Sequence, residues 1–554
     1  MNRLVKFLPI IQWARTYKKS EIRFDIIAGI VVAGLIIPES MGIADVAGVQ
    51  PQHGLYAILI ALFLYAIFGS GRHSVVSTPS AMAILAATVI ASLALTQYED
   101  VLAAVVTITV LVGMILVVMA VLRLGLLANF ISYPVMKGFL FGLALTIIIS
   151  QIPKLLGLHR GSGNFFEQLW QILTSLDQTN LLTLGLAIMA MAVLLVLEVR
   201  FKKIPAVLLL FVLGISLSYF LDWEGRGVEI VGTIPAGLPS LVIPEFSPEL
   251  VFLVIPAAIG IAFVCFSESV AIGQEVGERH KDEIDPNQEL IAIAATNLGS
   301  SMVQGIGTGV SMSASYAADN SGSKSQMTLI IAGLVVLVTL LFLTGVFYYL
   351  PEFVLGVIVI FAVSGALKYK LMVSFYHIQR SDFYCAIAAL LGVLIFEVLV
   401  GLVLAVFLAL GLVIWKISHE SGSVLGRTAE GEFCDAALHP GAEEIEGVKI
   451  FRLNLPIFYV NAPVVKTHLL KILRTDPKVK LLIIDMEVQI KRVDITSAKA
   501  LMSVIQAARD RGVEVALARI HTVPLKDLEA EGVIDLLGRE NIYHEIEQAV
   551  NHRR

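Results

Sequence analysis

Charged side chains and cysteines are scarce in this chain of 554 residues. Only 15% of the residues are charged and 57% are hydrophobic, and the mean hydropathy is +0.83. A water-exposed surface carries roughly 25–35% charged residues, so water cannot surround most of this chain. The three cysteines, Cys265, Cys385 and Cys434, are far apart and fit no metal-ligand spacing. We therefore expect unpaired thiols and no structural metal.

The sequence also lacks the common catalytic motifs. It contains no GxxxxGK[ST], HExxH or GxSxG pattern, which removes the usual evidence for an ATPase, a metalloprotease or a hydrolase. The net charge of -5 is small for this length and does not indicate a nucleic-acid partner. We predict a protein that is not an enzyme and needs no cofactor beyond a coupling ion.

What the chain has instead is long apolar runs. A run of about 20 residues spans the hydrocarbon core of a bilayer, and such runs recur from residue 23 to residue 417, clearly at 101–122, 181–199, 327–347 and 382–416. With the segments broken by Gly and Pro, we count about 12 to 14 spans. The basic segment 1–22 precedes the first run, and bases recur near 200 and 279, which predicts that these parts lie in the cytoplasm.

The composition changes after residue 417. We expect a linker at 418–446, rich in Gly and acids, followed by a soluble domain at 447–554. Stretches near 448, 481 and 513 resemble strands, and residues 497–512 show the apolar spacing of one helix face, with Gly512 at the end. Strands alternating with helices over about 100 residues predict one small α/β domain.

Two distant stretches of the membrane region repeat one pattern. Glu39, in GLIIPESMG, precedes STPSAMA at 77–83, and Glu268, in AFVCFSESVAIG, precedes GVSMSAS at 309–315. An acid in an apolar segment is costly unless it faces a cavity or a partner, and matched interruptions in two halves of a membrane protein indicate a transport site. The alternatives are an acid at a helix end, a carboxylate held by Ser267 and Ser269, and close helix packing at the small residues.

Four separated stretches carry a family resemblance: DIIAG at 25–29, PESMGIADVAGVQPQHGLYA at 38–57, FGSGRHSVVSTPSAMA at 68–83 and NQELIAIAATNLGSSMVQGIGTGVSMSAS at 287–315. They resemble the signature of the sulfate permease (SulP) family of anion transporters, and the tail resembles that family's STAS domain. The resemblance implies an all-α membrane domain of about 14 segments, arranged as a 7+7 inverted repeat with core and gate domains. It also implies a homodimer, with the N-terminus and the STAS domain in the cytoplasm.

The resemblance further implies that the third and tenth segments are half-helices whose N-termini face each other inside the membrane. Helix N-termini offer free backbone N–H groups and a partial positive charge, which together bind anions. The family's substrate-binding positions correspond to Glu39, Ile43, Ser80, Ala81, Ser311, Met312 and Ser313. The coupling-ion positions correspond to Glu268, Glu39, Gly309 and Ser313.

The sequence departs from the family pattern at Ala314, because many relatives have Arg there. Losing a fixed positive charge weakens the attraction for a doubly charged anion. In the soluble domain, Thr496 matches a phosphorylated position of STAS relatives, although Ser497 stands where those relatives have Gly. Helix capping by Asp494 or Thr496 is the alternative interpretation.

We therefore predict a multi-pass protein of the inner or plasma membrane that carries a small inorganic or carboxylate anion by alternating access. Bicarbonate or sulfate is the favoured substrate, with dicarboxylates next, and the two acids favour symport with a proton or sodium ion over anion exchange or channel-like uniport. Two alternatives from other classes are a nucleobase–cation symporter and an anion-sensing scaffold that does not transport. The STAS domain's partner is open.

Overall fold

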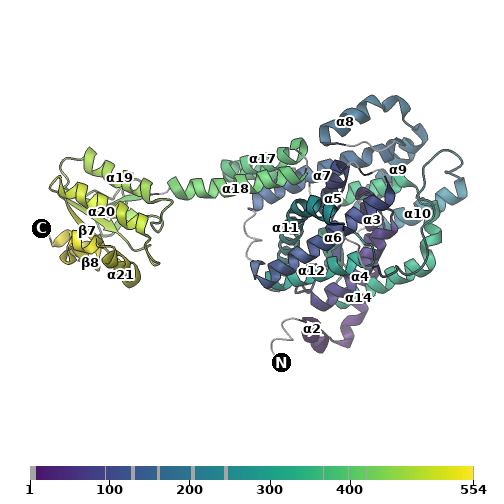
Figure 1. The fold of residues 1–554 in the computed structure, drawn as a ribbon, viewed down its shortest axis with the longest axis horizontal. Coiled ribbons are helices and arrows are strands. Elements are labelled where there is room, and N and C mark those ends of the chain that lie inside the picture. Colours follow the sequence, from purple (N-terminus) through teal and green to yellow (C-terminus); the bar gives the residue numbers. More distant parts are fainter. Residues whose placement is uncertain are drawn as a thin grey trace. The chain divides into compact units, whose positions relative to one another are not determined.

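The protein's structure, a computed structural model, describes residues 8–93, 95, 97–125, 132–158, 163–200, 206–242, 247–365, 367–396, 398–419 and 421–552. Residues 1–7 of the predicted cytoplasmic segment, and Lys202 and Lys203 of the basic cluster near 200, lie outside these ranges. The chain forms two compact units, Met1–Ala409 and Leu410–Arg554, which are coloured purple to green and green to yellow in Figure 1.

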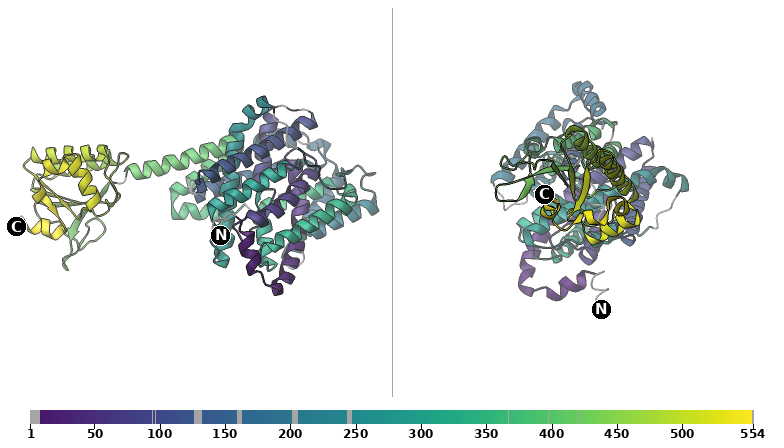
Figure 2. Two further views of the ribbon diagram at one scale, coloured as in Figure 1. Left: turned by 60° about the horizontal axis from the view of Figure 1, so that its bottom comes forward. Right: turned by 90° about the vertical axis from the view of Figure 1, so that its left-hand side faces the viewer.

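The membrane unit is built from helices, with two short strands between them (Figure 1 and Figure 2). Its first half contains α3 (Ile22–Val46), α4 (Gln52–Phe68), α5 (Ser80–Ser92), α6 (Tyr98–Val121), α7 (Tyr133–Leu156), α9 (Leu181–Arg200) and α10 (Ala206–Leu221). The second half contains α11 (Pro248–His280), α12 (Pro286–Ser301), α13 (Met312–Asn320), α14 (Met327–Val338), α15 (Glu352–Ser364), α17 (Arg380–Phe396) and the start of α18 (Val398–His419), whose residues from Leu410 on belong to the second unit.

The two halves repeat one order of elements within the described residues. In each half the third helix is preceded by a two-residue strand, β1 (Val76–Ser77) or β2 (Gly309–Val310). In each half a ten-residue connecting helix follows the fifth long element, α8 (Phe165–Thr174) after α7 and α16 (Tyr369–Ile378) after α15. The predicted helical membrane fold with a repeated half is therefore confirmed.

Hydropathy and exposure together indicate which surface meets lipid. Seven helices of the described residues are long and apolar enough to cross a membrane, and α4, α5 and α10 are shorter apolar helices. Large apolar side chains on this unit are strongly exposed: Leu181, Val199, Phe220 and Phe252 are 76–80% exposed. Such exposure would cost free energy in water but costs little against acyl chains.

Buried carboxylates connect segments that are distant in sequence. Glu289, on α12, accepts hydrogen bonds from the hydroxyl of Tyr65 at 2.9 Å and from the backbone N–H of Ser70 at 2.9 Å. Asp25, on α3, accepts one from the hydroxyl of Ser325 at 2.8 Å, close to the start of α14. Because each buried charge is satisfied by several donors, these residues serve as structural clamps rather than ligand sites.

Helix α7 lies against α17 along its glycine face. A Cβ added to Gly138 would come within 2.0 Å of the carbonyl oxygen of Ala386, and one added to Gly142 within 2.9 Å of that of Leu390. The GFLFG glycines therefore pack two helices of the same chain closely together. Because the glycine face of α7 packs against α17, the neighbouring Lys137 lies on a different face of the helix.

The second unit is a six-stranded sheet with helices on its faces. The strand order is β4-β3-β5-β6-β7-β8, in which β3 is antiparallel to β4 and β5, and β5 to β8 are parallel. The strands are β3 (Gly422–Arg427), β4 (Phe433–Asp435), β5 (Val448–Leu453), β6 (Leu481–Asp485), β7 (Glu514–Ala518) and β8 (Ile542–Tyr543). The helices are α19 (Ala462–Thr475), α20 (Ile495–Arg509), α21 (Thr522–Ala530), α22 (Val533–Leu537) and α23 (Ile546–Asn551).

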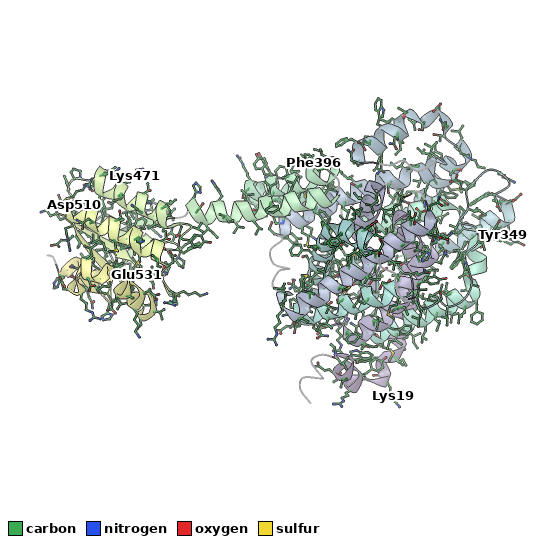
Figure 3. The ribbon with its side chains drawn as sticks, in the orientation of Figure 1. Lys19, Tyr349, Phe396, Lys471, Asp510 and Glu531 are labelled. Carbon is green, nitrogen blue, oxygen red and sulfur yellow. The ribbon has the colours of Figure 1, made fainter. Side chains whose placement is uncertain are left out.

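Alternating residues of the parallel strands form two cores. Leu482 and Ile484 pack with α19 and α20 on one face, and Leu481 and Ile483 pack with α23 on the other. Side chains of successive strand residues point to opposite faces, so a strand covered on both faces is apolar throughout. Charged residues such as Lys471, labelled in Figure 3, cover the outside of this unit.

One boundary expectation needs correction. The range 418–446, expected as a linker, contains β3 and β4, which are part of the sheet. These strands are short and lie at one edge of the sheet, so their sequence lacks the continuous apolar pattern of β6. In addition, α21 and α22 are separated at Gly532, whose φ is 76°. Glycine adopts this left-handed conformation readily.

Candidate anion-binding site

The two half-helices of the membrane unit begin at one antiparallel strand pair. Val76 pairs with Val310, and Ser77 pairs with Gly309. Helix α5 begins at Ser80 and helix α13 at Met312, each three residues after the Ser77–Gly309 pair. Because the strands are antiparallel, the two helices leave the pair in opposite directions, with both N-termini at the pair. The free N–H groups of two helix starts are therefore placed near each other.

The start of α13 is capped by a hydroxyl side chain. Ser311 is the N-cap, and its Oγ accepts a hydrogen bond from the N–H of Ala314 at 3.3 Å. The Oγ of Ser311 lies 3.0 Å from that of Ser313. The N–H of Ser311 donates to the carbonyl oxygen of Val75 at 2.8 Å, which attaches this helix start to the chain entering β1. Two hydroxyls thus stand beside the first turn of α13.

The start of α5 depends on a proline and on a close approach by glycine. Pro79 precedes Ser80, so the missing N–H of proline removes no helical hydrogen bond. A Cβ on Gly309 would lie 3.0 Å from the ring of Pro79 and 2.9 Å from the sulfur of Cys265. Ser80 is partly exposed and Ala81 is buried. Small residues therefore allow β2 to pass directly beside the first turn of α5.

Glu39 is held at the start of α13. It lies in the middle of α3, directly after Pro38, and is 6% exposed. The hydroxyl of Ser313 donates to its carboxylate, at 3.2 Å from Oε1 and 3.3 Å from Oε2. Ile43, about one turn further along α3, is 2% exposed. The expected residues Glu39, Ser311 and Ser313 are thus joined in one hydrogen-bonded group.

Glu268 lies in a different environment. It is on α11 and lines a cavity of about 360 Å³ with Met312, the first residue of α13. Its Oε2 is buried and has no hydrogen-bond partner among the described residues. The Oγ of Ser267 likewise has no hydrogen-bond partner among the described residues, and the Oγ of Ser269 contacts the N–H of Val310, which it accepts at 3.0 Å. The structure therefore does not support the reading of Glu268 as a carboxylate satisfied by its neighbouring serines.

The remaining expected residues occupy different surroundings. Gly309 is buried in β2 against α11 and is not among the described residues that line the cavity. Ala314 is fully buried and brings no charge to the start of α13.

Thr496 is exposed in the first turn of α20, in the other unit, where Asp494 is the N-cap and accepts the N–H of Ser497 at 3.0 Å. A regulatory role for Thr496 stays a prediction.

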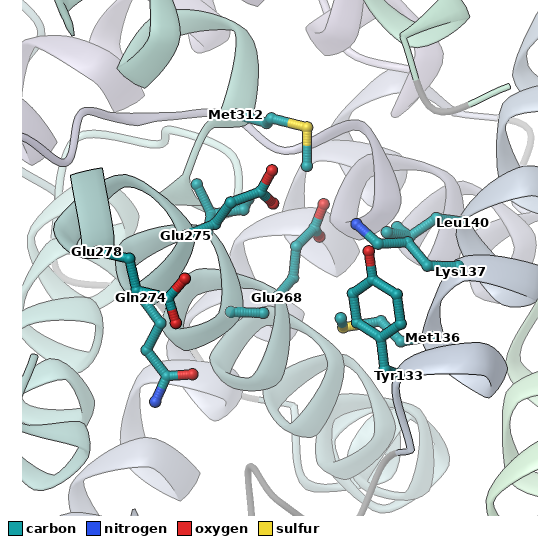
Figure 4. Close-up of a pocket in the computed structure, with 11 residues that line it drawn as sticks. Tyr133, Met136, Lys137, Leu140, Glu268, Gln274, Glu275, Glu278 and Met312 are labelled. Atoms are coloured by element: carbon teal, nitrogen blue, oxygen red, sulfur yellow. The ribbon is translucent and has the colours of Figure 1, made fainter. Parts of the chain in front are cut away.

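Lys137 is the residue that the sequence analysis missed. It projects from α7 into the cavity that Glu268 lines, and Figure 4 shows the charged ends of the two side chains pointing toward each other. A single base within an apolar segment is a signal comparable to Glu39 and Glu268. Lys154, on the same helix, is a structural contrast because it pairs with Asp45 at 2.6 Å. Only the packing of α7 distinguishes the two lysines.

Two family models match the chain. The sulfate permease family matches residues 22–389, and the STAS domain matches residues 439–549. A probable sulfate transporter of Mycobacterium tuberculosis is 30% identical, over 97% of this chain and 96% of its own. The chloroplastic sulfate transporter 4.1 of Arabidopsis thaliana is 27% identical, over 98% of this chain and 82% of its own. Solute carrier family 26 member 6 of Homo sapiens is 29% identical, over 83% of this chain and 64% of its own.

Solved structures show the same fold. The murine solute carrier 26 family member A9 anion transporter, in the inward-facing state, matches with a TM-score of 0.89 at 24% identity, covering 100% of this chain and 94% of its own. The transmembrane domain of the cyanobacterial bicarbonate transporter BicA matches with a TM-score of 0.62 at 20% identity, covering 71% of this chain and 99% of its own. The chain therefore belongs to the sulfate permease family of multi-pass membrane anion transporters and carries a C-terminal STAS domain.

Proposed function

We propose that this protein is a secondary active transporter that moves sulfate across the membrane together with a coupling cation. The observation that carries the proposal is the convergence of two helix starts, those of α5 and α13, on the β1–β2 pair inside an apolar unit. Backbone N–H groups at helix starts bind anions without a full positive charge nearby. The hydroxyls of Ser80, Ser311 and Ser313 add hydrogen-bond donors at that place.

Glu39 gives this site a means of responding to a cation. In the structure its carboxylate accepts the Ser313 hydroxyl, so it holds a donor that an arriving anion would also use. An ionised carboxylate that lies within hydrogen-bonding distance of Ser313 also repels an anion that binds to the same hydroxyl. Binding of a cation near the acids reduces that repulsion, and by linkage the bound anion then favours the cation. Glu268, with its unpartnered oxygen in the cavity, is the proposed main cation ligand.

Sulfate is favoured among the candidate anions because named relatives over nearly the full length of the chain are sulfate transporters. Bicarbonate and dicarboxylates are the competitors, because Ala314 removes a charge that would help to hold a doubly charged anion. Transport by alternating access would carry the core, including α5 and α13, past the remaining helices.

The placement in the cell is part of the same proposal. A protein of the inner or plasma membrane with a cytoplasmic N-terminus follows from the basic segment 1–22 and the positive-inside rule. The STAS domain would then lie in the cytoplasm, and the working form would be a homodimer. Protease accessibility in right-side-out and inverted vesicles tests the orientation, and mass photometry in detergent tests the dimer.

Uptake into proteoliposomes tests the proposed function. Purified protein is reconstituted, and labelled sulfate, bicarbonate and succinate are each supplied outside, with a pH gradient or a sodium gradient imposed separately. We expect sulfate to accumulate when a cation gradient is present, and unlabelled sulfate to compete best. Uptake of bicarbonate but not sulfate would reassign the substrate. Absence of flux for all three anions under either gradient would overturn transport and favour the scaffold alternative.

A further inference from the structure

The cavity beside α13 contains one positively charged side chain among its described lining residues. The lining comes from α7, α11 and the start of α13: Tyr133, Met136, Lys137, Leu140, Glu268, Ala271, Ile272, Gln274, Glu275, Glu278 and Met312. The cavity thus holds three carboxylates and one ammonium group. Figure 4 shows Glu268 and Lys137 opposite each other, with Met312 above them. A positive charge in this cavity needs an explanation, because charged groups inside a membrane are costly.

Lys137 is not held in a structural ion pair. Its recorded contact is with the ring of Tyr133, at 5.1 Å from the ring centre, and no carboxylate oxygen of the described residues lies within 4 Å of it. Glu275 and Glu268, carboxylates of the same cavity lining, attract its charge, and Lys368 repels it. Its ammonium group is therefore free to change partners. Lys154, paired with Asp45 on the same helix, is not.

Three of the other charged side chains near this place, Glu275, Arg279 and Glu39, already have partners. Glu275 accepts the hydroxyl of Tyr316, and Arg279 lies 4.4 Å from the centre of the Tyr316 ring. On α3, Glu39 accepts the hydroxyl of Ser313. Glu278 is a further carboxylate of the lining, labelled in Figure 4. Among the carboxylates of the cavity, Glu268 is the one whose buried Oε2 has no hydrogen-bond partner among the described residues, and Lys137 faces it in Figure 4.

The surroundings of Glu268 suit a proton better than a sodium ion. A hard cation needs several oxygen ligands. Leu140, Ala271 and Ile272 offer no side-chain oxygen, and of the other carboxylates in the lining, Glu275 already accepts the Tyr316 hydroxyl. An ammonium group also repels any second cation that enters the cavity. A proton needs no coordination shell, because it forms one O–H bond on the carboxylate.

We propose that Lys137 selects the proton as the coupling ion by occupying, with its ammonium group, the place that a sodium ion would take beside Glu268. This inference rests on the proposed transport function and deepens it. When Glu268 is ionised, its carboxylate attracts Lys137. When a proton from the aqueous phase binds, an O–H bond forms on Glu268, the attraction to Lys137 is lost, and the ammonium group turns its charge to the anion near Met312. Release of that proton on the other side restores the first arrangement.

This assignment also explains the absence of a charge at position 314. Ala314 is buried in the first turn of α13 and cannot attract an anion by charge. Lys137 brings a positive charge to the same cavity from α7 instead, beside Met312, which starts α13. The positive charge is thus placed on a different helix, where it serves both the anion and Glu268.

The experiment compares sulfate uptake by the wild type and Lys137→Met in proteoliposomes, with a pH gradient or a sodium gradient imposed separately. In the wild type, a gradient of one pH unit corresponds to about tenfold accumulation of sulfate for each coupled proton. Replacing choline, an inert cation, by sodium in the external buffer should leave sulfate uptake by the wild type unchanged. In Lys137→Met, a sodium gradient should raise uptake by at least about fivefold, the lower end of usual coupling. Lys137→Arg should keep the proton preference, and Lys370→Met, which removes an exposed lysine of α16, should behave as the wild type.

A second measurement does not depend on transport. Dicyclohexylcarbodiimide modifies protonated carboxyl groups in apolar surroundings, and mass spectrometry reports the modification of Glu268, with Glu268→Gln as the blank. Sodium should protect Glu268 in Lys137→Met and leave it unprotected in the wild type. Sodium-driven uptake or sodium protection in the wild type, or the same cation preference with and without Lys137, would overturn the inference. Absence of sulfate flux in the wild type under both gradients, with labelling as expected, would instead contradict the proposed function alone.

Discussion

The two halves of the membrane unit place an acid at corresponding positions but give it different surroundings. Glu39, in the first half, accepts a hydrogen bond from Ser313 of the second half. Glu268, in the second half, has a buried oxygen without a hydrogen-bond partner among the described residues and faces a cavity with Lys137. A repeated backbone thus supports two different roles, because each acid meets side chains that its repeat does not share. We interpret Glu39 as the substrate-side acid and Glu268 as the cation-side acid.

Neutralising Glu268 should have the largest effect, because it tests directly whether this acid binds the coupling cation. Glu268→Gln keeps the shape and removes the charge that binds the coupling cation, so gradient-driven sulfate accumulation should fall by about 10- to 100-fold, within the usual range of coupling between ligands. Exchange of labelled for unlabelled sulfate, without any gradient, should survive. Glu283→Gln, at an exposed position after α11, is the matched control. Undiminished cation dependence in Glu268→Gln would remove the proposed role.

Ser313 tests the role of Glu39, because its hydroxyl connects the second half of the membrane unit to this acid of the first half. Ser313→Ala removes the donor that Glu39 accepts and that an anion would share. A hydrogen bond to a charged group contributes about 1.5–3 kcal/mol, so the KM for sulfate should rise at least about tenfold with little change in protein yield. Initial-rate uptake against sulfate concentration measures this. Ser364→Ala, exposed at the end of α15, is the control, and an equal KM in the two variants would argue against a direct contact.

Glu39→Gln should change the KM for sulfate in the opposite direction from Ser313→Ala. The glutamine can still accept the Ser313 hydroxyl, but it no longer repels the anion. Charges about 4 Å apart interact by about 1 kcal/mol or more, so the KM for sulfate should fall about fivefold or more at neutral pH. The KM for sulfate of Glu39→Gln should also depend less on pH than the KM of the wild type. A raised KM would indicate that the carboxylate attracts the coupling cation here as well, and the division of roles between the two acids would be wrong.

The smallest effect concerns a helix start in water. In the STAS domain, Asp494 caps α20 by accepting the N–H of Ser497, whereas Ser311 caps α13 in the membrane. Asp494→Ala should cost about 1 kcal/mol of local stability, seen as faster hydrogen exchange at the start of α20 in the full-length protein. Thr496→Ala, which changes an exposed side chain of the same turn, should leave exchange unchanged. Equal changes in hydrogen exchange for the two variants would mean that the side chain of Asp494 does not stabilise the start of α20.

Much of the fold could be predicted from the sequence because its signals are local. Apolar runs indicated the spans, and the spacing of residues such as Leu501 and Val504 indicated α20. The strands β3 and β4 could not be recognised, because a short edge strand has neither length nor alternation. The candidate acids were found because a charge within an apolar segment is conspicuous. Lys137 carried the same signal, but nothing in the sequence separated it from the structural Lys154.

The sequence by itself determined that this chain lies in a membrane, that a small α/β domain follows, and that it belongs to the sulfate permease family. The tertiary structure decided that Glu39 meets Ser313, 274 residues away, that β1 pairs with β2, and that Lys137 and Glu268 line the same cavity. Hydropathy and spacing report on one segment at a time, because they reflect only where each residue lies along its own helix. Contacts between distant segments depend on how helix faces pack, as with the glycines of α7 against α17, and that packing is a property of the whole fold.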